Sequence, residues 1–111
     1  MARTYRILGQ INPASNTLSN VYVVPSGNSA IISSIVVASL GEIGTGNSFS
    51  LAVNVGGVPV SNSNYIAYNV NCPVKDTVTL TLGVTLNAGS ILSANANCGN
   101  FAFTAFGTEI Y

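Results

Sequence analysis

Charged residues are scarce in this sequence of 111 residues, and their scarcity excludes several classes of function. Three residues are basic and three are acidic, so 5% of the chain is charged, against about a quarter in an ordinary globular protein. Binding to nucleic acid and attraction to anionic lipid headgroups both require clustered Lys and Arg. Because Arg3, Arg6 and Lys75 cannot form such a cluster, we expect neither a nucleic acid nor a membrane as a partner.

Histidine is absent, which removes the commonest general base and the commonest metal ligand. The three carboxylates, Glu42, Asp76 and Glu109, are far apart in the sequence, so their spacing does not predict the paired carboxylates of a glycosidase. Asp76 is interpreted as a turn residue that accepts a hydrogen bond from a nearby backbone N–H. A calcium ligand is the alternative, although calcium usually takes more than one carboxylate. We expect no enzymatic activity, no cofactor and no metal site.

Cysteines and long apolar runs are also few. Cys72 and Cys98 are too few for a disulfide scaffold, so we interpret them as free thiols, with a Cys72–Cys98 bridge as the alternative. A cysteine nucleophile would need a base, and Lys75 is the one candidate close to Cys72. The longest apolar runs, such as Ile35–Ala38, are far shorter than the ~20 residues of a membrane span. No apolar segment follows the first arginines, so we expect no secretory signal.

Strand periodicity is what the sequence does contain. The segment Thr77–Leu86 alternates apolar residues with threonines, which predicts a strand with one buried face. Ile31–Ser39 is rich in Ile and Val without alternating, so we expect it in the middle of a sheet. Shorter or weaker strand patterns occur at Thr4–Gly9, Asn20–Val24, Phe49–Val55, Tyr65–Val70, Ser90–Ala96 and Asn100–Phe106.

Turn signals separate these segments. The dipeptides Gly27-Asn28, Gly46-Asn47 and Gly99-Asn100 suit type II′ turns, which place glycine at the first central position. No segment shows a capped 3.6-residue apolar pattern, so helix is expected to be nearly absent. About eight short strands at regular spacing predict one all-β domain over residues 1–111, an antiparallel β-sandwich. A jelly roll is our first topology and an immunoglobulin-like sandwich the alternative.

The composition also predicts self-association. A chain with almost no charge has little electrostatic repulsion between copies. The segment Ile31–Val37 has high β-propensity and no charge or proline, so exposure of its edge would promote aggregation. Tyrosine suits interfaces because it offers apolar area and a hydroxyl together. We therefore predict interface roles for tyrosines, with half-buried strand packing as the simpler alternative for each: Tyr5, Tyr22, Tyr65, Tyr68 and Tyr111.

The strand and turn patterns resemble small structural proteins of tailed bacteriophages over nearly the whole chain. The resemblance rests on five segments: Tyr5–Gln10, Val21–Pro25, Ile32–Val37, Asp76–Leu86 and Phe103–Ile110. It implies a virion component made in the host cytoplasm. Its expected partners are further copies of the same chain and other virion proteins such as the major capsid protein. It further implies a capsid decoration or cement subunit, as a homotrimer or another closed oligomer, or alternatively a tail, baseplate or fibre component. It implies no catalytic residues.

A small carbohydrate-binding module is the alternative from another class of function. That interpretation requires exposed aromatic rings beside amide groups. One cluster fits the requirement, formed by Tyr65 and Tyr68 with the side chains of Asn62, Asn64 and Asn69.

Overall fold

Eight strands and one short 3₁₀ turn form the part of the chain that the computed structural model describes, residues 3–14, 16–39, 48–55, 60–71, 76–97 and 101–111. The prediction of an all-β fold is confirmed. The elements are β1 (Arg3–Ile11), β2 (Ser19–Val23), β3 (Ser29–Ser39), β4 (Ser48–Val55), η1 (Asn62–Asn64), β5 (Tyr65–Asn71), β6 (Thr77–Leu86), β7 (Ser90–Ala96) and β8 (Phe101–Ile110).

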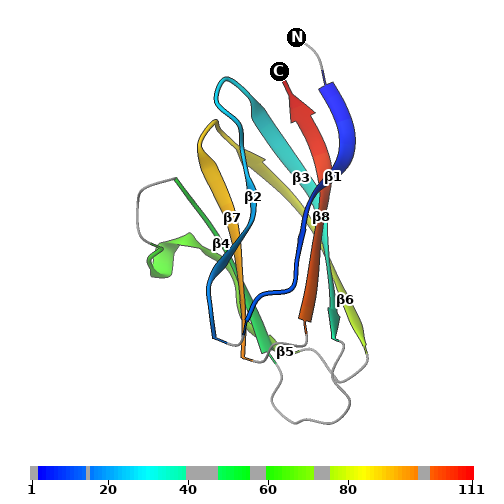
Figure 1. Cartoon of the computed structure of the whole chain (residues 1–111), viewed down its shortest axis with the longest axis vertical. Helices are drawn as coiled ribbons and strands as arrows, with labels where there is room; N and C mark the ends of the chain where they lie inside the picture. Colours follow the sequence, from blue (N-terminus) through cyan, green and yellow to red (C-terminus); the bar gives the residue numbers. More distant parts are fainter. Residues whose placement is uncertain (1–2, 15, 40–47, 56–59, 72–75, 98–100) are drawn as a thin grey trace.

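The strands form two four-stranded antiparallel sheets that pack face to face (Figure 1). The first has the order β1-β8-β3-β6 and the second the order β2-β7-β4-β5. This order is that of a jelly roll, two interleaved Greek keys, and it confirms the predicted sandwich. In an immunoglobulin sandwich the first two strands pair within one sheet. Here β1 pairs with β8 and β2 with β7, so the immunoglobulin-like alternative is wrong.

The core lies between the sheets and is built by strict alternation on the central strands. Phe101, Phe103 and Ala105 of β8 are fully buried, whereas the residues between them are half-buried. Phe49 of β4 packs edge-on against both rings, with centroids 6.1 Å from Phe101 and 5.8 Å from Phe103. Strand β3 lies between β8 and β6, as its Ile- and Val-rich, non-alternating sequence predicts.

A line of register shifts crosses the first sheet at the level of Phe106. Leu8 of β1 has no partner between the pairs Ile7–Phe106 and Gly9–Ala105, and Ser33 is likewise extra in β3 relative to β8. Such bulges bend a strand and re-aim its side chains. Leu8 consequently turns into the core next to an exposed Ile7. Beyond the bulge β1 approaches β2 so closely that a Cβ on Gly9 would lie 2.0 Å from the carbonyl oxygen of Val21.

The turn at Gly27 differs from its prediction. The Asn28 N–H donates to the Pro25 carbonyl at 3.1 Å, so Gly27 is the second central residue, with a φ of +83°. Positive φ at that position is a feature of a type II turn, and the type II′ assignment is wrong here. The other two Gly-Asn dipeptides, Gly46-Asn47 and Gly99-Asn100, lie outside the described residues.

Candidate functional site

The predicted interface tyrosines divide into an exposed group and one buried residue. Tyr5, Tyr68 and Tyr111 are 75%, 64% and 55% exposed, and Tyr65 is half-buried. Tyr22 is 6% exposed, because β2 turns its side chain into the sandwich. Its hydroxyl is therefore directed at another group inside the molecule rather than at the surface.

That group is the carboxylate of Glu109. Glu109 continues the inward alternation of β8 beyond Phe103 and Ala105, so strand geometry itself carries a carboxylate into the end of the core. The Tyr22 hydroxyl donates a short hydrogen bond to Glu109 Oε2. Arg6 Nη2 of β1 donates to the same oxygen at 3.2 Å. We call these three residues the Glu109 triad; it joins β2 of one sheet to β1 and β8 of the other.

The triad shifts the acidity of both acids in it. The Tyr22 hydroxyl bonded to Glu109 lowers the pKa of that carboxyl; burial opposes this effect, and the hydrogen bond and charge of Arg6 add to it. Burial, followed by the hydrogen bond and the charge of Glu109, raises the pKa of Tyr22 to about 12. At neutral pH the site therefore holds an ionised carboxylate, a neutral phenol and a guanidinium.

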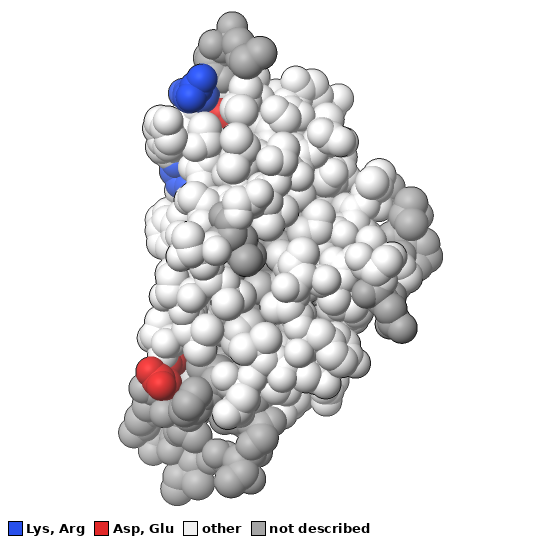
Figure 2. Space-filling view, turned by 180° about the vertical axis from the view of Figure 1, so that it is seen from behind, with Lys and Arg blue, Asp and Glu red and all other residues white. Residues whose placement is uncertain are grey.

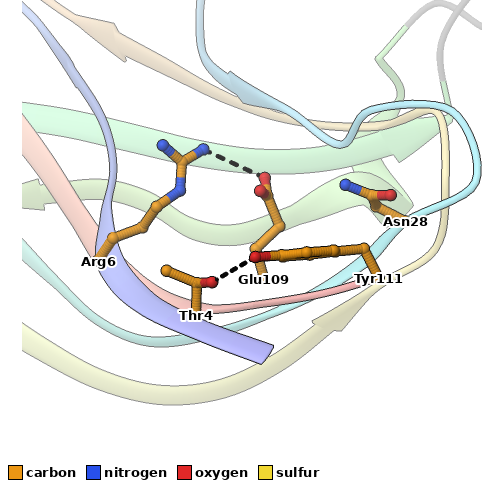
Figure 3. A pocket seen from close by; sticks show the side chains of 5 residues that line it. All are labelled: Thr4, Arg6, Asn28, Glu109 and Tyr111. Carbon is orange, nitrogen blue, oxygen red and sulfur yellow. Dashed lines mark hydrogen bonds and ion pairs between the residues drawn. The ribbon is translucent and has the colours of Figure 1, made fainter. Parts of the chain in front are cut away.

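An open pocket lies beside the triad. It has a volume of about 420 Å³ and is lined by Thr4, Arg6, Asn28, Glu109 and Tyr111 (Figure 3). The Tyr111 hydroxyl and the Thr4 hydroxyl form a hydrogen bond of 2.7 Å, which fixes the tyrosine ring at the pocket. The sequence placed Tyr111 among the candidates but not Glu109 or Arg6. The signal for Glu109 was the period of two that runs from Phe101 to Glu109.

A second surface covers the outside of the first sheet. Cross-strand registers align Tyr5 with Thr108 and then Ile31, and align Ile7 with Phe106 in the next row. Residues paired across strands point to the same face, so these five side chains form one patch, which we call the outer patch. Tyr5, Ile7 and Ile31 are 75%, 48% and 39% exposed. None of these five residues is charged, and Arg3, two residues before Tyr5 on β1, borders the patch on the same face. In the view from behind, the Lys and Arg atoms gather along the side of the molecule that carries the first sheet, and most of the visible surface is uncharged (Figure 2).

The proposed glycan cluster is less open than the sequence suggested. The rings of Tyr65 and Tyr68 pack edge to face with centroids 4.9 Å apart, so each ring covers part of the other. The side chain of Asn64 accepts hydrogen bonds from Ser61 at the start of η1, including 2.7 Å from its backbone N–H. Asn69 has a φ of 49°, and its N–H donates to the Ser50 hydroxyl. The side chain of Asn62 lies outside the described part.

Asp76 behaves as the sequence predicts for a turn residue. Its carboxylate accepts a hydrogen bond of 2.8 Å from the Thr77 N–H, and its carbonyl accepts one of 2.8 Å from the Ser39 N–H. These contacts fix the start of β6 beside the end of β3. The structure does not describe four of the residues considered in the sequence: Glu42, Cys72, Lys75 and Cys98. The predicted free thiols and the alternative Cys72–Cys98 bridge therefore both lie outside the described residues.

Among the described residues, no three His, Cys, Asp or Glu side chains gather in a way that could hold a metal ion. The same residues include no helix with the length and apolar character needed to cross a bilayer.

No protein-family model and no curated protein matches this chain. Two solved structures resemble it over 96% of its length, each a pentameric capsid protein isolated from metagenomic phage sequences, one of them solved by iodide phasing. The first shares 18% identity with a TM-score of 0.43, and the second 16% with a TM-score of 0.38. The chain spans 64% and 65% of their lengths. At these scores the comparison carries no functional argument, and the fold assignment rests on the strand order itself.

Proposed function

We propose that this chain is a non-enzymatic structural protein of a tailed-phage virion, and that it works as a closed homo-oligomer. The observation that carries the proposal is the outer patch: five uncharged side chains, several of them large and apolar, on an exposed sheet face, with Arg3 of β1 at its border. In an antiparallel sheet with one face in solvent, the side chains on that face are normally polar or charged. A contiguous patch of uncharged side chains with an exposed Tyr and two exposed Ile residues is typical of a protein contact surface.

The jelly-roll topology supports this proposal at the level of fold. Jelly rolls occur in viral capsid proteins and in lectins, and a fold by itself assigns no function. The resemblance of the strand segments to small structural proteins of tailed phages points to the first of these groups. Within that class we propose a capsid decoration or cement subunit that contacts the major capsid protein, with a tail, baseplate or fibre position as the alternative.

The dimensions of the sheet are compatible with such a contact. Four strands spaced about 4.8 Å apart, with about ten residues each at about 3.4 Å, present a face of roughly 650 Å² in projection. The accessible area of a corrugated face exceeds its projection, which brings it near the ~800 Å² per partner of a standard interface. One sheet face is thus large enough to hold a stable oligomer.

Solution mass tests the oligomer. Light scattering behind a sizing column should give one mass, a trimer or another closed oligomer, that does not change with concentration. The variant Ile7→Lys places a charge in the outer patch and should shift the mass to that of the monomer, because burying an unpaired ammonium is costly. Asn71→Lys adds the same charge at the exposed end of β5 and should leave the oligomer intact. A monomeric parent chain, or equal behaviour of both variants, would contradict the proposed interface.

Particle composition tests the virion role separately. Mass spectrometry of purified virions should detect the chain, and tailless heads should retain it if it decorates the capsid. Detection in isolated tails instead would favour the tail or baseplate position. Absence from purified particles would refute the virion role even if the oligomer is confirmed.

A further inference from the structure

The pocket beside the Glu109 triad combines chemical groups that the outer patch does not need. It lies where β1 begins and β8 ends, and its lining comes from both of these strands, from the residue after β8 and from the turn before β3. Its volume of about 420 Å³ falls within the ~300–1,000 Å³ typical of small-ligand sites. Two of the chain's six charged residues, Arg6 and Glu109, meet there.

The charge of this pocket is balanced. The Arg6 guanidinium and the Glu109 carboxylate neutralise one another at 3.2 Å, and the other lining residues, Thr4, Asn28 and Tyr111, are uncharged. An anion would meet the Glu109 carboxylate, and a cation would meet the guanidinium. The pocket therefore favours a neutral ligand that both donates and accepts hydrogen bonds.

Unused hydrogen-bonding groups point into this space. Glu109 Oε2 accepts from Tyr22 and Arg6, whereas Oε1 accepts no hydrogen bond from the described residues. The Asn28 side chain likewise has no hydrogen-bond partner among the described residues, and its amide nitrogen is turned toward Glu109 (Figure 3). Arg6 is 46% exposed at its side chain and uses one of its five N–H donors in the triad. Donors and acceptors thus stand next to one another.

The Tyr111 ring supplies an apolar surface below these groups. Figure 3 shows the ring edge-on, so that one face is turned toward the space between Arg6, Glu109 and Asn28. The ring is 55% exposed, and the hydrogen bond between its hydroxyl and the Thr4 hydroxyl holds it in this position. An exposed aromatic face under a set of fixed polar groups suits a ligand with one C–H face and a rim of hydroxyl groups.

We propose that this pocket binds a neutral sugar ring. The C–H face of the ring packs on Tyr111, while neighbouring hydroxyls donate to Glu109 Oε1 and accept from Arg6 and the Asn28 amide. The site is distinct from the Tyr65–Tyr68 cluster, whose rings pack on one another and whose neighbour Asn64 is already used in the 3₁₀ turn. The proposal goes beyond the virion role and does not depend on it.

Nuclear magnetic resonance titration of the ¹⁵N-labelled chain tests the site. The probes are glucose, galactose, mannose and N-acetylglucosamine, each added alone to about 100 mM, because a single ring with few hydrogen bonds is expected to bind with a Kd of about 1–10 mM. At least one of these sugars should shift the side-chain signals of Arg6 and Asn28. Shifts centred on Tyr65 and Tyr68, or no shifts with any of the sugars, would overturn the proposal.

Matched variants make the assignment specific. Asn28→Ala removes the side-chain amide but keeps the backbone hydrogen bond to Pro25. Thr4→Val removes the hydroxyl that forms a hydrogen bond with the Tyr111 hydroxyl, so the tyrosine ring is no longer held at the pocket. Both should weaken the sugar response by about tenfold or more, while Asn71→Ala, at the exposed end of β5, should not change it. Thermal melting confirms that each variant is folded. An unchanged response in Asn28→Ala, or displacement of the sugar by inorganic phosphate, would identify a different site or a simple anion site and overturn the proposal.

Discussion

Removing the hydroxyl of Tyr22 should reveal how much the Glu109 triad stabilises the contact between the sheets. The hydroxyl is buried and donates to a carboxylate, and hydrogen bonds to charged groups contribute about 1.5–3 kcal/mol. Tyr22→Phe leaves the ring in place and removes that bond, so we expect the free energy of unfolding to fall by about 2 kcal/mol. Arg6 does not compensate, because its partly exposed ion pair is expected to contribute at most about 1 kcal/mol.

Urea unfolding at neutral pH measures this change. With a denaturant slope of about 1–3 kcal/mol/M, a loss of about 2 kcal/mol moves the midpoint by roughly 1 M. Tyr68→Phe is the matched control, since Tyr68 is 64% exposed and its ring rather than its hydroxyl makes the contact with Tyr65. Its effect should stay within about 0.5 kcal/mol. Equal midpoints for the two variants would refute a stabilising triad.

The same variant should lose its effect in acid. The folded-state pKa of Glu109 is lowered, chiefly by the Tyr22 hydroxyl, so the folded state holds its proton less tightly than the unfolded chain. The contribution of the triad is fully present above the ordinary carboxyl pKa of about 4.3 and is lost as the pH falls through the lowered value. The difference between parent and Tyr22→Phe should therefore shrink below about pH 4. A difference that stays constant down to pH 2 would show that the carboxylate charge is not involved.

Two further pairs of variants test the close approach of the sheets and the packing of the core. Gly9→Ala should destabilise the fold by more than about 2 kcal/mol in the same urea assay, because its Cβ would meet the Val21 carbonyl oxygen at 2.0 Å. A Cβ on Gly83 would meet nothing within 4 Å, so Gly83→Ala is the control and should be neutral or mildly stabilising. Phe103→Ala should cost about 3–5 kcal/mol and Phe106→Ala distinctly less, because Phe103 is fully buried against Phe49 and Phe106 is half-buried on the outer face. Comparable losses at the two phenylalanines would contradict the assigned faces of β8.

The sequence predicted the strands well where one face is buried and the other is exposed. Strand β6 has the predicted bounds, Thr77–Leu86, because its threonines alternate with apolar residues along an edge of the sheet. The length of β8 was missed, since Gly107 and Glu109 do not look like core residues even though they continue the alternation from Phe101. A glycine and a carboxylate interrupt the hydrophobic signal without interrupting the strand.

The inward position of Tyr22 could not be read from the local pattern. A register shift between Asn20 and Tyr22 leaves Val21 without a partner on β7. Val21 and Tyr22 are consequently both buried, which strict alternation forbids. A bulge depends on the strand opposite, and the sequence alone does not specify which strand that is. The triad could not be predicted for the same reason, because its three residues meet only when β1, β2 and β8 are placed next to one another.

The composition of the triad itself argues for a role beyond stability. Replacing a buried polar network as a whole by apolar residues of similar size is often neutral or even stabilising, so apolar residues in place of all three members could have closed this end of the core at no greater cost. The chain otherwise avoids charge almost completely, at 5% of its residues. A carboxylate that is 9% exposed, lines a pocket and accepts hydrogen bonds from the described residues through one oxygen alone matches a group held in position for a ligand better than a group needed for packing. The outer patch and this pocket therefore separate two requirements: the uncharged patch suits contact with another protein, and two of the chain's six charged residues, Arg6 and Glu109, line a pocket that a polar ligand can reach.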